Sequence, residues 1–290
     1  MSATVQYEPA GVRAASDGLL GDTTKRDYSR KLQLFNRFAE PELRAIIADL
    51  DLRPGQRVLD AGCGTGEALE WLTQKIEPDG QAIGFDLATA HVLAATCNRL
   101  SPRALVLQAD LLRPPLRPQS FELIWSVNTI NHLRDPVRAV AALKALARPG
   151  GRVVVGQSSL LPEMYFAWDA RLERVTNEAV RQYYRDRYGL TEHDLTSVRA
   201  LVGWFRAAQL RSVMVRTVMI ERISPLPPAT EAYLLEAVFR DTWGERLRPY
   251  LCATDFAELL CLCNPDHPQF ALRRADFHYL QSFTVVIGAA

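Results

Sequence analysis

The chain of 290 residues lacks several features that would place it in a special class. It has no run of about 18 consecutive apolar residues, so no membrane-spanning helix is predicted. Its 34 basic and 33 acidic residues leave a net charge of only +1, which gives no long-range attraction to nucleic acid or to an acidic membrane. We therefore expect neither nucleic acid nor a membrane as a partner.

Cysteines and targeting signals are also sparse. The five cysteines are an odd number and are scattered, so they do not form a disulfide framework. The first twenty residues hold neither a basic segment nor an unbroken apolar one, so no secretory leader is predicted. Cys261 and Cys263 are more typical of an apolar helix face than of a zinc site, and no metal is predicted. These absences favour a cytoplasmic protein.

Strand-like and helix-like segments alternate through most of the chain. Two helices, at 24–39 and from Pro41 onward, precede the first strand. Strands are expected at 58–60, 81–86, 104–108, 121–126, 153–155, 213–220 and 283–287. Helical segments separate them, except that a loop broken by prolines at 111–119 leads to the strand at 121–126. This alternation predicts an α/β fold with a doubly wound, mostly parallel sheet.

The second half of the chain suggests a division into core and cap. Residues 157–193 and 222–276 hold helical segments with many aromatic side chains that the sheet does not require, and we interpret them as helical caps over the sheet. The alternatives are ordinary helical core or the surface of a homodimer. The predicted division is a flexible tail at 1–22, a core at 23–156, a cap at 157–193, a core helix and strand at 194–221, a second cap at 222–276 and a final core strand at 277–290.

The most informative motif is the segment from Val58 to Glu67, in which a strand leads into a glycine-rich turn and then a helix. Such a turn lets a nucleotide-like ligand contact the backbone directly. The spacing of Gly62, Gly64 and Gly66 differs from the dinucleotide fingerprint, and Glu67 stands where a phosphate-binding loop would need a lysine. The acidic residues Asp60, Asp86 and Asp110 follow three successive strands, which favours a cationic ligand with an adenosine part over a pyrophosphate.

Five segments, VLDAGCGTG, GFDLA, QADLLRPPL, FELIWSVNTINHL and LARPGGRVVV, resemble the class I S-adenosylmethionine-dependent methyltransferases that act on small molecules. The resemblance covers residues 40 to 157. It implies a Rossmann-like sheet of seven strands with the last one antiparallel, and S-adenosyl-L-methionine as the cofactor.

The resemblance also implies roles for individual residues. It puts Gly62 and Gly64 beside the methionine part of the cofactor, Asp86 on the ribose, and Asp110 with Leu111 at the adenine. Asn128 would lie beneath the reacting methyl group. Three further residues are assigned to the cofactor site: Asp60, Leu87 and Tyr28. Tyr28 lies on the leading helix and resembles the residue that closes over the cofactor in relatives, with simple packing as the alternative.

The implied activity is methyl transfer to an O, N or C nucleophile of a small, apolar or aromatic metabolite, in a setting of bacterial specialised metabolism. His132 is the candidate general base, and a structural histidine is the alternative. The arginines of the first cap, including Arg187, either clamp an anionic substrate or form a solvated helix face, which we favour. Rival functions are a non-methylating reaction on the same fold (cyclisation or decarboxylation), methylation of a macromolecule, and a nicotinamide dehydrogenase.

Overall fold

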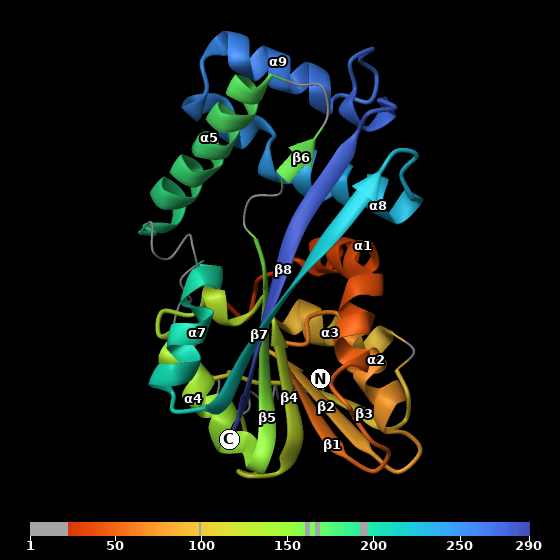
Figure 1. The fold of residues 1–290 in the computed structure, drawn as a ribbon, viewed down its shortest axis with the longest axis vertical. Helices are drawn as coiled ribbons and strands as arrows, with labels where there is room; N and C mark the ends of the chain where they lie inside the picture. Colours follow the sequence, from red (N-terminus) through yellow and green to blue (C-terminus); the bar gives the residue numbers. More distant parts are fainter. Residues whose placement is uncertain (1–22, 99, 160–162, 166–168, 192–196) are drawn as a thin grey trace, which may run out of the picture.

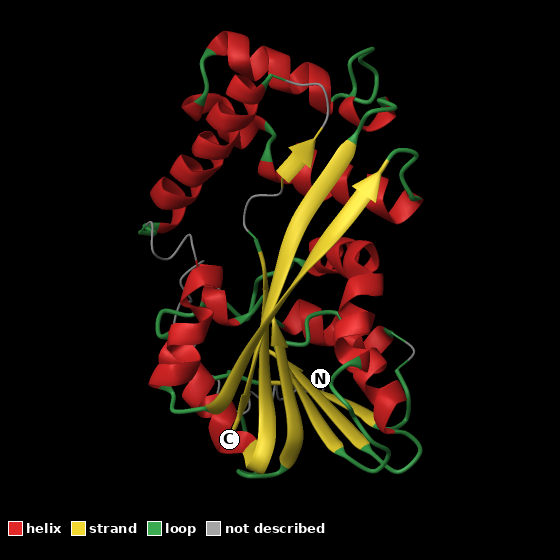
Figure 2. Cartoon of the chain, in the orientation of Figure 1, coloured by secondary structure: helices red, strands yellow, loops and turns green. Residues whose placement is uncertain are grey.

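One twisted sheet runs through the protein, and helices cover both of its faces (Figures 1 and 2). The computed structural model describes residues 23–98, 100–159, 163–165, 169–191 and 197–290. The strands are β1 Arg57–Ala61, β2 Gln81–Asp86, β3 Ala104–Gln108, β4 Phe121–Val127, β5 Ala147–Ser158, β6 Glu163–Tyr165, β7 Arg211–Ile223 and β8 His278–Ala289. The α-helices are α1 Ser29–Ala48, α2 Glu67–Ile76, α3 Thr89–Cys97, α4 Pro136–Leu146, α5 Ala170–Tyr188, α7 Ser197–Ala207, α8 Pro228–Tyr233 and α9 Ala253–Cys263. Shorter turns are η1 Ile130–His132, η3 Glu245–Tyr250 and η4 Ala271–Arg273, and η2 Leu234–Thr242 is a π-helix.

The longer strands are ordered β3-β2-β1-β4-β5-β8-β7 across the sheet. Strands β1 to β5 pair in parallel, whereas β8 runs antiparallel to both β5 and β7. The predicted mostly parallel sheet of seven strands with an antiparallel last strand is therefore confirmed. The sequence did not predict β6, a short strand that also pairs with β8 and makes the sheet eight-stranded. The strand order reverses between β1 and β4, which is where open α/β sheets bind their ligands.

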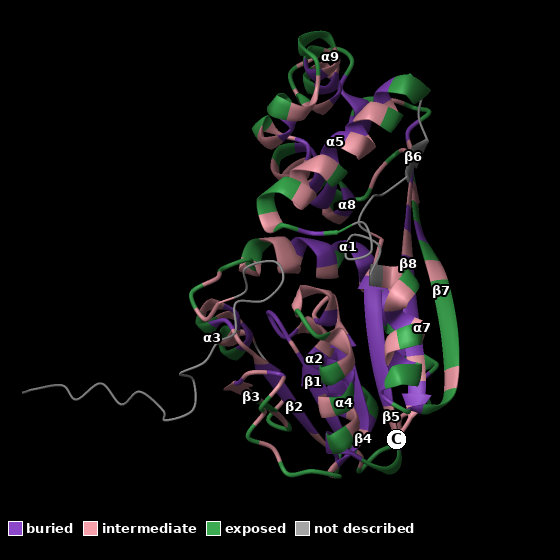
Figure 3. Ribbon diagram, turned by 90° about the vertical axis from the view of Figure 1, so that its left-hand side faces the viewer, coloured by how far each residue is buried: buried purple, intermediate pink, exposed green. Residues whose placement is uncertain are grey.

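Buried residues form one hydrophobic layer on each face of the sheet. Successive strand residues point to opposite faces, so Val58 packs in the layer with α1 and α2 and Leu59 in the layer with α4 and α7. Figure 3 shows the buried strands between these helices, with β7 more exposed at the edge. Among the described residues, no helix has the length and apolar character needed to cross a membrane.

The two leading helices that the sequence predicts are a single helix. α1 continues through Pro41, and Tyr28 precedes it at the N-cap position instead of lying on it. Phe38 from the first half of the helix and Ile46 from the second are both about 1% exposed and belong to the same hydrophobic layer. Burial of one continuous face thus outweighs the backbone hydrogen bond that proline cannot make.

The remaining differences concern the second half of the chain. Strands β7 and β8 are longer than predicted and run beyond the rest of the sheet to the region where α5, α8 and α9 lie (Figure 1). These helices lie past the carboxyl ends of the parallel strands, as expected for a cap, although the domain boundaries themselves stay a prediction. The predicted tail at 1–22 and the start of the predicted helix at 194–208 lie outside the described residues.

Candidate active site

The glycine-rich turn connects β1 to α2 and is packed tightly against neighbouring strand ends. Gly62 has a φ of +80°, and the backbone N–H groups of Gly62 and Cys63 both donate to the carbonyl oxygen of Phe85, at 2.8 and 2.9 Å. A Cβ at Gly62 would lie 2.3 Å from Oγ1 of Thr129, just past β4. The turn therefore needs glycine for its backbone conformation and for its close approach to β4.

Asp86, at the end of β2, fixes the turn and the start of α3. One carboxylate oxygen accepts a hydrogen bond from Gly64 N at 3.0 Å, and the other accepts one from Ala88 N at 2.9 Å. The second oxygen also lies 3.1 Å from Nδ1 of His91, whose Nε2 accepts from the N–H of Tyr28 at 3.0 Å. This arrangement requires the neutral His91 tautomer with its proton on Nδ1.

Sequence reasoning missed His91, which links the end of β2 to the segment that leads into α1. The signal available was its position, five residues after Asp86 in the helix that follows the strand. A histidine one helical turn beyond a strand-end carboxylate can reach back to it. The spacing does not show that the other ring nitrogen meets the backbone of Tyr28, 63 residues earlier in the chain.

Asp60, the last acidic residue of β1, lies directly beneath the glycine turn. Its side chain is 2% exposed, and no hydrogen-bond partner among the described residues reaches its Oδ2 atom. Burial, with further contributions from Asp86 and Glu67, raises the pKa of this carboxyl group to about 8. A buried carboxylate oxygen without a partner, close to two other acidic groups, is suited to a cationic ligand.

A cavity of about 120 Å³ opens above the turn at the carboxyl ends of the strands. Most of the predicted cofactor residues and the candidate base line it: Tyr28, Gly62, Gly64, Asp86, Leu87, Asp110, Leu111, Asn128 and His132. Asp60 is the exception, because it lies beneath the turn and outside the lining. The topology thus brings together side chains that the sequence separates by more than 100 positions.

Asp110 and Asn128 are held by different local structures. Asp110 Oδ1 accepts a hydrogen bond from Leu112 N at 2.9 Å, which turns the chain after β3. Asn128 has a φ of +51°, and its Oδ1 accepts from the N–H and the hydroxyl of Ser158, at 2.9 and 3.1 Å. The carbonyl oxygen of the Asn128 side chain therefore joins the ends of β4 and β5.

A second, larger cavity of about 370 Å³ adjoins the first and lies beneath the helices of the upper region. Five residues line both cavities: Arg26, Tyr28, Leu32, Asn128 and His132. Burial, together with the positive charge of Arg26, lowers the pKa of His132 to about 4. His132 is therefore a neutral imidazole at neutral pH, placed where the two cavities meet.

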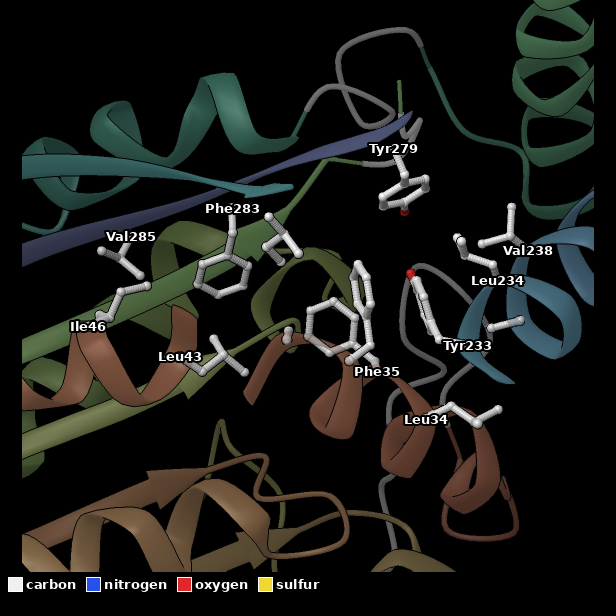
Figure 4. Packing of buried hydrophobic residues seen from close by; sticks show 14 of the residues in the cluster. Leu34, Phe35, Leu43, Ile46, Tyr233, Leu234, Val238, Tyr279, Phe283 and Val285 are labelled. Carbon is white, nitrogen blue, oxygen red and sulfur yellow. The ribbon is translucent and has the colours of Figure 1, made fainter. Parts of the chain in front are cut away.

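Aromatic stacking fixes one wall of the larger cavity to the core. Tyr233, from α8, stacks on Phe38 of α1 with ring centroids 4.4 Å apart, and its ring meets that of Phe35 edge-on at 6.0 Å. Figure 4 shows Tyr233 reaching toward Phe35 and Tyr279 from the opposite side of the cluster. The hydroxyl of Tyr279 donates to Gln281, which also lines the cavity. The upper helices are thus packed firmly onto α1 and β8.

The sequence also raised a zinc site at the cysteines and an anion clamp at the arginines of the first cap. In the described part of the chain, no group of three or more His, Cys, Asp or Glu side chains could hold a metal ion. Arg185 pairs with Glu178 of the same helix, as expected for a solvated helix face, whereas Arg171 pairs with Asp255 of α9. Arg187, in contrast, lines the larger cavity.

Comparisons with known proteins agree with this geometry. Residues 59–155 match a protein family described as a methyltransferase domain. The chain is 33% identical over 127 residues to an uncharacterized 37.1 kDa protein in transposon TN4556 of Streptomyces fradiae, covering 43% of this chain and 37% of that protein. It is 30% identical over 118 residues to the 27-O-demethylrifamycin SV methyltransferase of Amycolatopsis mediterranei (strain S699), covering 39% of this chain and 42% of that enzyme.

The chain therefore spans less than half the length of these two curated relatives. Its fold is similar to the crystal structure of the YcgJ protein from Bacillus subtilis, with a TM-score of 0.52 and 14% sequence identity. That match covers 86% of this chain and 98% of the other. The likeness extends beyond the matched domain and shows a shared Rossmann-like fold.

Proposed function

We propose that residues 59–155, which match a methyltransferase domain, belong to the class I S-adenosylmethionine-dependent family, and that the chain transfers the methyl group of S-adenosylmethionine to a small molecule. The observation that carries the proposal is the cavity in which the glycine turn meets Asp86 and Asp110 above the buried Asp60. A turn with three glycines, close to acidic groups, fits a cationic adenosyl ligand.

Each wall of this cavity has a part in binding. Gly62 and Gly64 line the cavity beside the proposed position of the methionine part, and the buried Asp60 carboxyl group favours positive charge there. Asp86 can accept from the ribose hydroxyls, and Asp110 with Leu111 borders the adenine position. Tyr28 also lines the cavity, and its backbone N–H donates to His91.

When bound, the cofactor supplies a methyl group that its sulfonium already activates. The residues of the chain then have mainly to place the acceptor, and correct placement of two reacting groups contributes on the order of 7–11 kcal/mol. Asn128 and His132 line both cavities and so border the point of transfer. The neutral His132 ring can orient an acceptor by a hydrogen bond, but its lowered pKa makes it a weak base.

The larger cavity is the proposed acceptor site. Its walls combine the rings of Tyr183, Tyr184 and Tyr233 with apolar side chains such as Phe35 and Val238. A volume of about 370 Å³ is within the range of sites for small molecules, which supports a small, apolar or aromatic metabolite with an O, N or C nucleophile.

The wider setting is also a proposal. All five cysteines are free, as in a reducing compartment, which supports a cytoplasmic location. The similarity to an enzyme named for demethylrifamycin supports a role in bacterial specialised metabolism. A homodimer stays a prediction from the sequence.

Calorimetric titration with S-adenosylmethionine, S-adenosylhomocysteine and NAD tests the cofactor assignment. We expect both adenosyl ligands to bind and NAD not to bind. Asp86→Ala removes the two charge-assisted hydrogen bonds that the carboxylate would accept from the ribose hydroxyls. Each is worth about 1.5–3 kcal/mol, so the Kd of the adenosyl ligands should rise by about 10²-fold or more. Asp79→Ala is the matched control, because Asp79 is exposed in the turn before the amino end of the same strand. Tight binding of NAD, or equal Kd values for the two variants, would contradict the proposal.

A further inference from the structure

The larger cavity is lined by more positive than negative side chains. Four cationic residues, Arg26, Lys31, Arg187 and Arg246, face a single carboxylate, Asp241, among the described lining residues. Asp241 forms ion pairs with Lys31, at 2.6 Å, and with Arg246. Among the lining residues that the structure describes, four positively charged side chains therefore accompany one carboxylate, and this part of the lining is cationic.

Aromatic rings accompany these charges. The Arg26 guanidinium lies 3.9 Å above the ring of Tyr28, and that of Arg187 lies 6.0 Å from the ring of Tyr188. Tyr188 in turn stacks on Tyr184 with centroids 5.7 Å apart. Burial raises the pKa of both of these tyrosine hydroxyls to about 12, so they stay protonated and able to donate. The wall offers flat apolar surface together with hydrogen-bond donors and positive charge.

The positive charges extend to the place where the two cavities meet. Arg26 lines both cavities, and the charges of Arg26 and Lys31 both lower the pKa of His132. A neutral alcohol or an ordinary phenol would need a base at this point, and His132 holds a proton too weakly to serve well. An acceptor that is already anionic needs no base, and the cationic lining would favour that ionised form.

We propose that the acceptor is an acidic aromatic compound, a carboxylic acid or an acidic phenol, and that its oxygen anion is itself the atom that receives the methyl group. This inference rests on the proposed methyl transfer. A lone pair of the oxyanion forms the new O–CH₃ bond while the S–CH₃ bond breaks and its electron pair returns to sulfur. The products are a neutral ester or aryl ether and a neutral thioether, and no proton has to move.

Titration of 4-nitrophenol tests the charge preference without requiring turnover, because its phenolate absorbs visible light. In the presence of saturating S-adenosylhomocysteine, we expect the pKa of the bound phenol to fall by about one unit relative to the free phenol. Arg187→Gln should reduce that fall. Arg181→Gln is the matched control, since Arg181 lies on the same helix, pairs with Glu178 and does not line the cavity.

Calorimetry with matched probes gives a second measurement. We expect 2-naphthoate to bind the complex with S-adenosylhomocysteine about ten-fold more tightly than neutral 2-naphthamide, and Arg187→Gln to remove most of that difference. A rise in the pKa of bound nitrophenol, equal binding of acid and amide, or no binding of either acidic probe would overturn the inference while leaving methyl transfer intact. Failure of S-adenosylhomocysteine itself to bind would instead overturn the proposed function, and this inference with it.

Discussion

Replacing Gly62 with alanine tests how closely the glycine turn is packed against the end of β4. The new Cβ would lie 2.3 Å from Oγ1 and 2.4 Å from Cγ2 of Thr129, and the backbone φ is +80°. A left-handed conformation costs a residue with a side chain about 1–2 kcal/mol, and overpacking of a buried site adds about 1–3 kcal/mol. We therefore expect the free energy of unfolding to fall by about 2–5 kcal/mol.

Gly55→Ala separates the two contributions. Gly55 has a φ of +86°, but no atom lies within 4 Å of the position that its Cβ would occupy. This control should lose only the conformational part, about 1–2 kcal/mol. Both substitutions remove the same conformational freedom of glycine from the unfolded chain. The difference between their losses in free energy of unfolding therefore measures the clash with Thr129.

Urea unfolding followed by circular dichroism and tryptophan fluorescence provides the measurement. The double variant Gly62→Ala/Thr129→Gly removes all three Thr129 atoms that the Cβ would meet, so it should show a favourable coupling energy of about 1–3 kcal/mol. Equal losses for Gly62→Ala and Gly55→Ala, or no coupling in the double variant, would refute the proposed close packing.

Three further predictions concern the site and its supports. Because the pKa of Asp60 is raised from 3.8 to about 8, the folded protein keeps a proton that the unfolded chain loses, so the free energy of unfolding without ligand should fall as the pH rises through this range. Asp60→Asn should flatten that dependence in urea unfolding between pH 5 and 8, and an unchanged slope would argue against the assignment. If the acceptor arrives as an oxyanion, His132→Gln should lower kcat by less than about ten-fold, whereas a loss of about 10²–10⁴-fold would identify His132 as a general base. Phe38→Ala should cost about 3–5 kcal/mol in urea unfolding, because Phe38 is 1% exposed and stacks on Tyr233; a loss below about 1 kcal/mol would show that this contact does not anchor the upper helices.

Many residues that line the smaller cavity were predictable from sequence because its parts are local. Asp86 ends β2 and Asp110 follows β3, while Asp60 lies near the end of β1 outside the lining, and parallel strands bring their carboxyl ends to the same edge of a sheet. The glycine spacing likewise determines a turn that only glycines adopt readily. These features depend on neighbours within a few residues, so a single sequence contains them.

The errors arose where distant segments compete with local preference. Pro41 is a helix-starting signal, yet the buried face shared by Phe38 and Ile46 keeps α1 continuous. The arginines of α5 are typical of a solvated face, yet α5 packs against η3 and Arg187 lines a cavity. The spacing of the residues concerned predicts neither the continuous helix nor the position of Arg187.

The sequence by itself determined the order of strands and helices, the glycine turn and the acidic strand ends, because hydrophobic periodicity and backbone conformation are local properties. Only the tertiary structure decided which side chains meet across the larger cavity, that His132 is half-buried and neutral, and that His91 joins Asp86 to Tyr28. Desolvation and charge interactions depend on distances between residues far apart in the chain, and those distances exist only once the chain has folded.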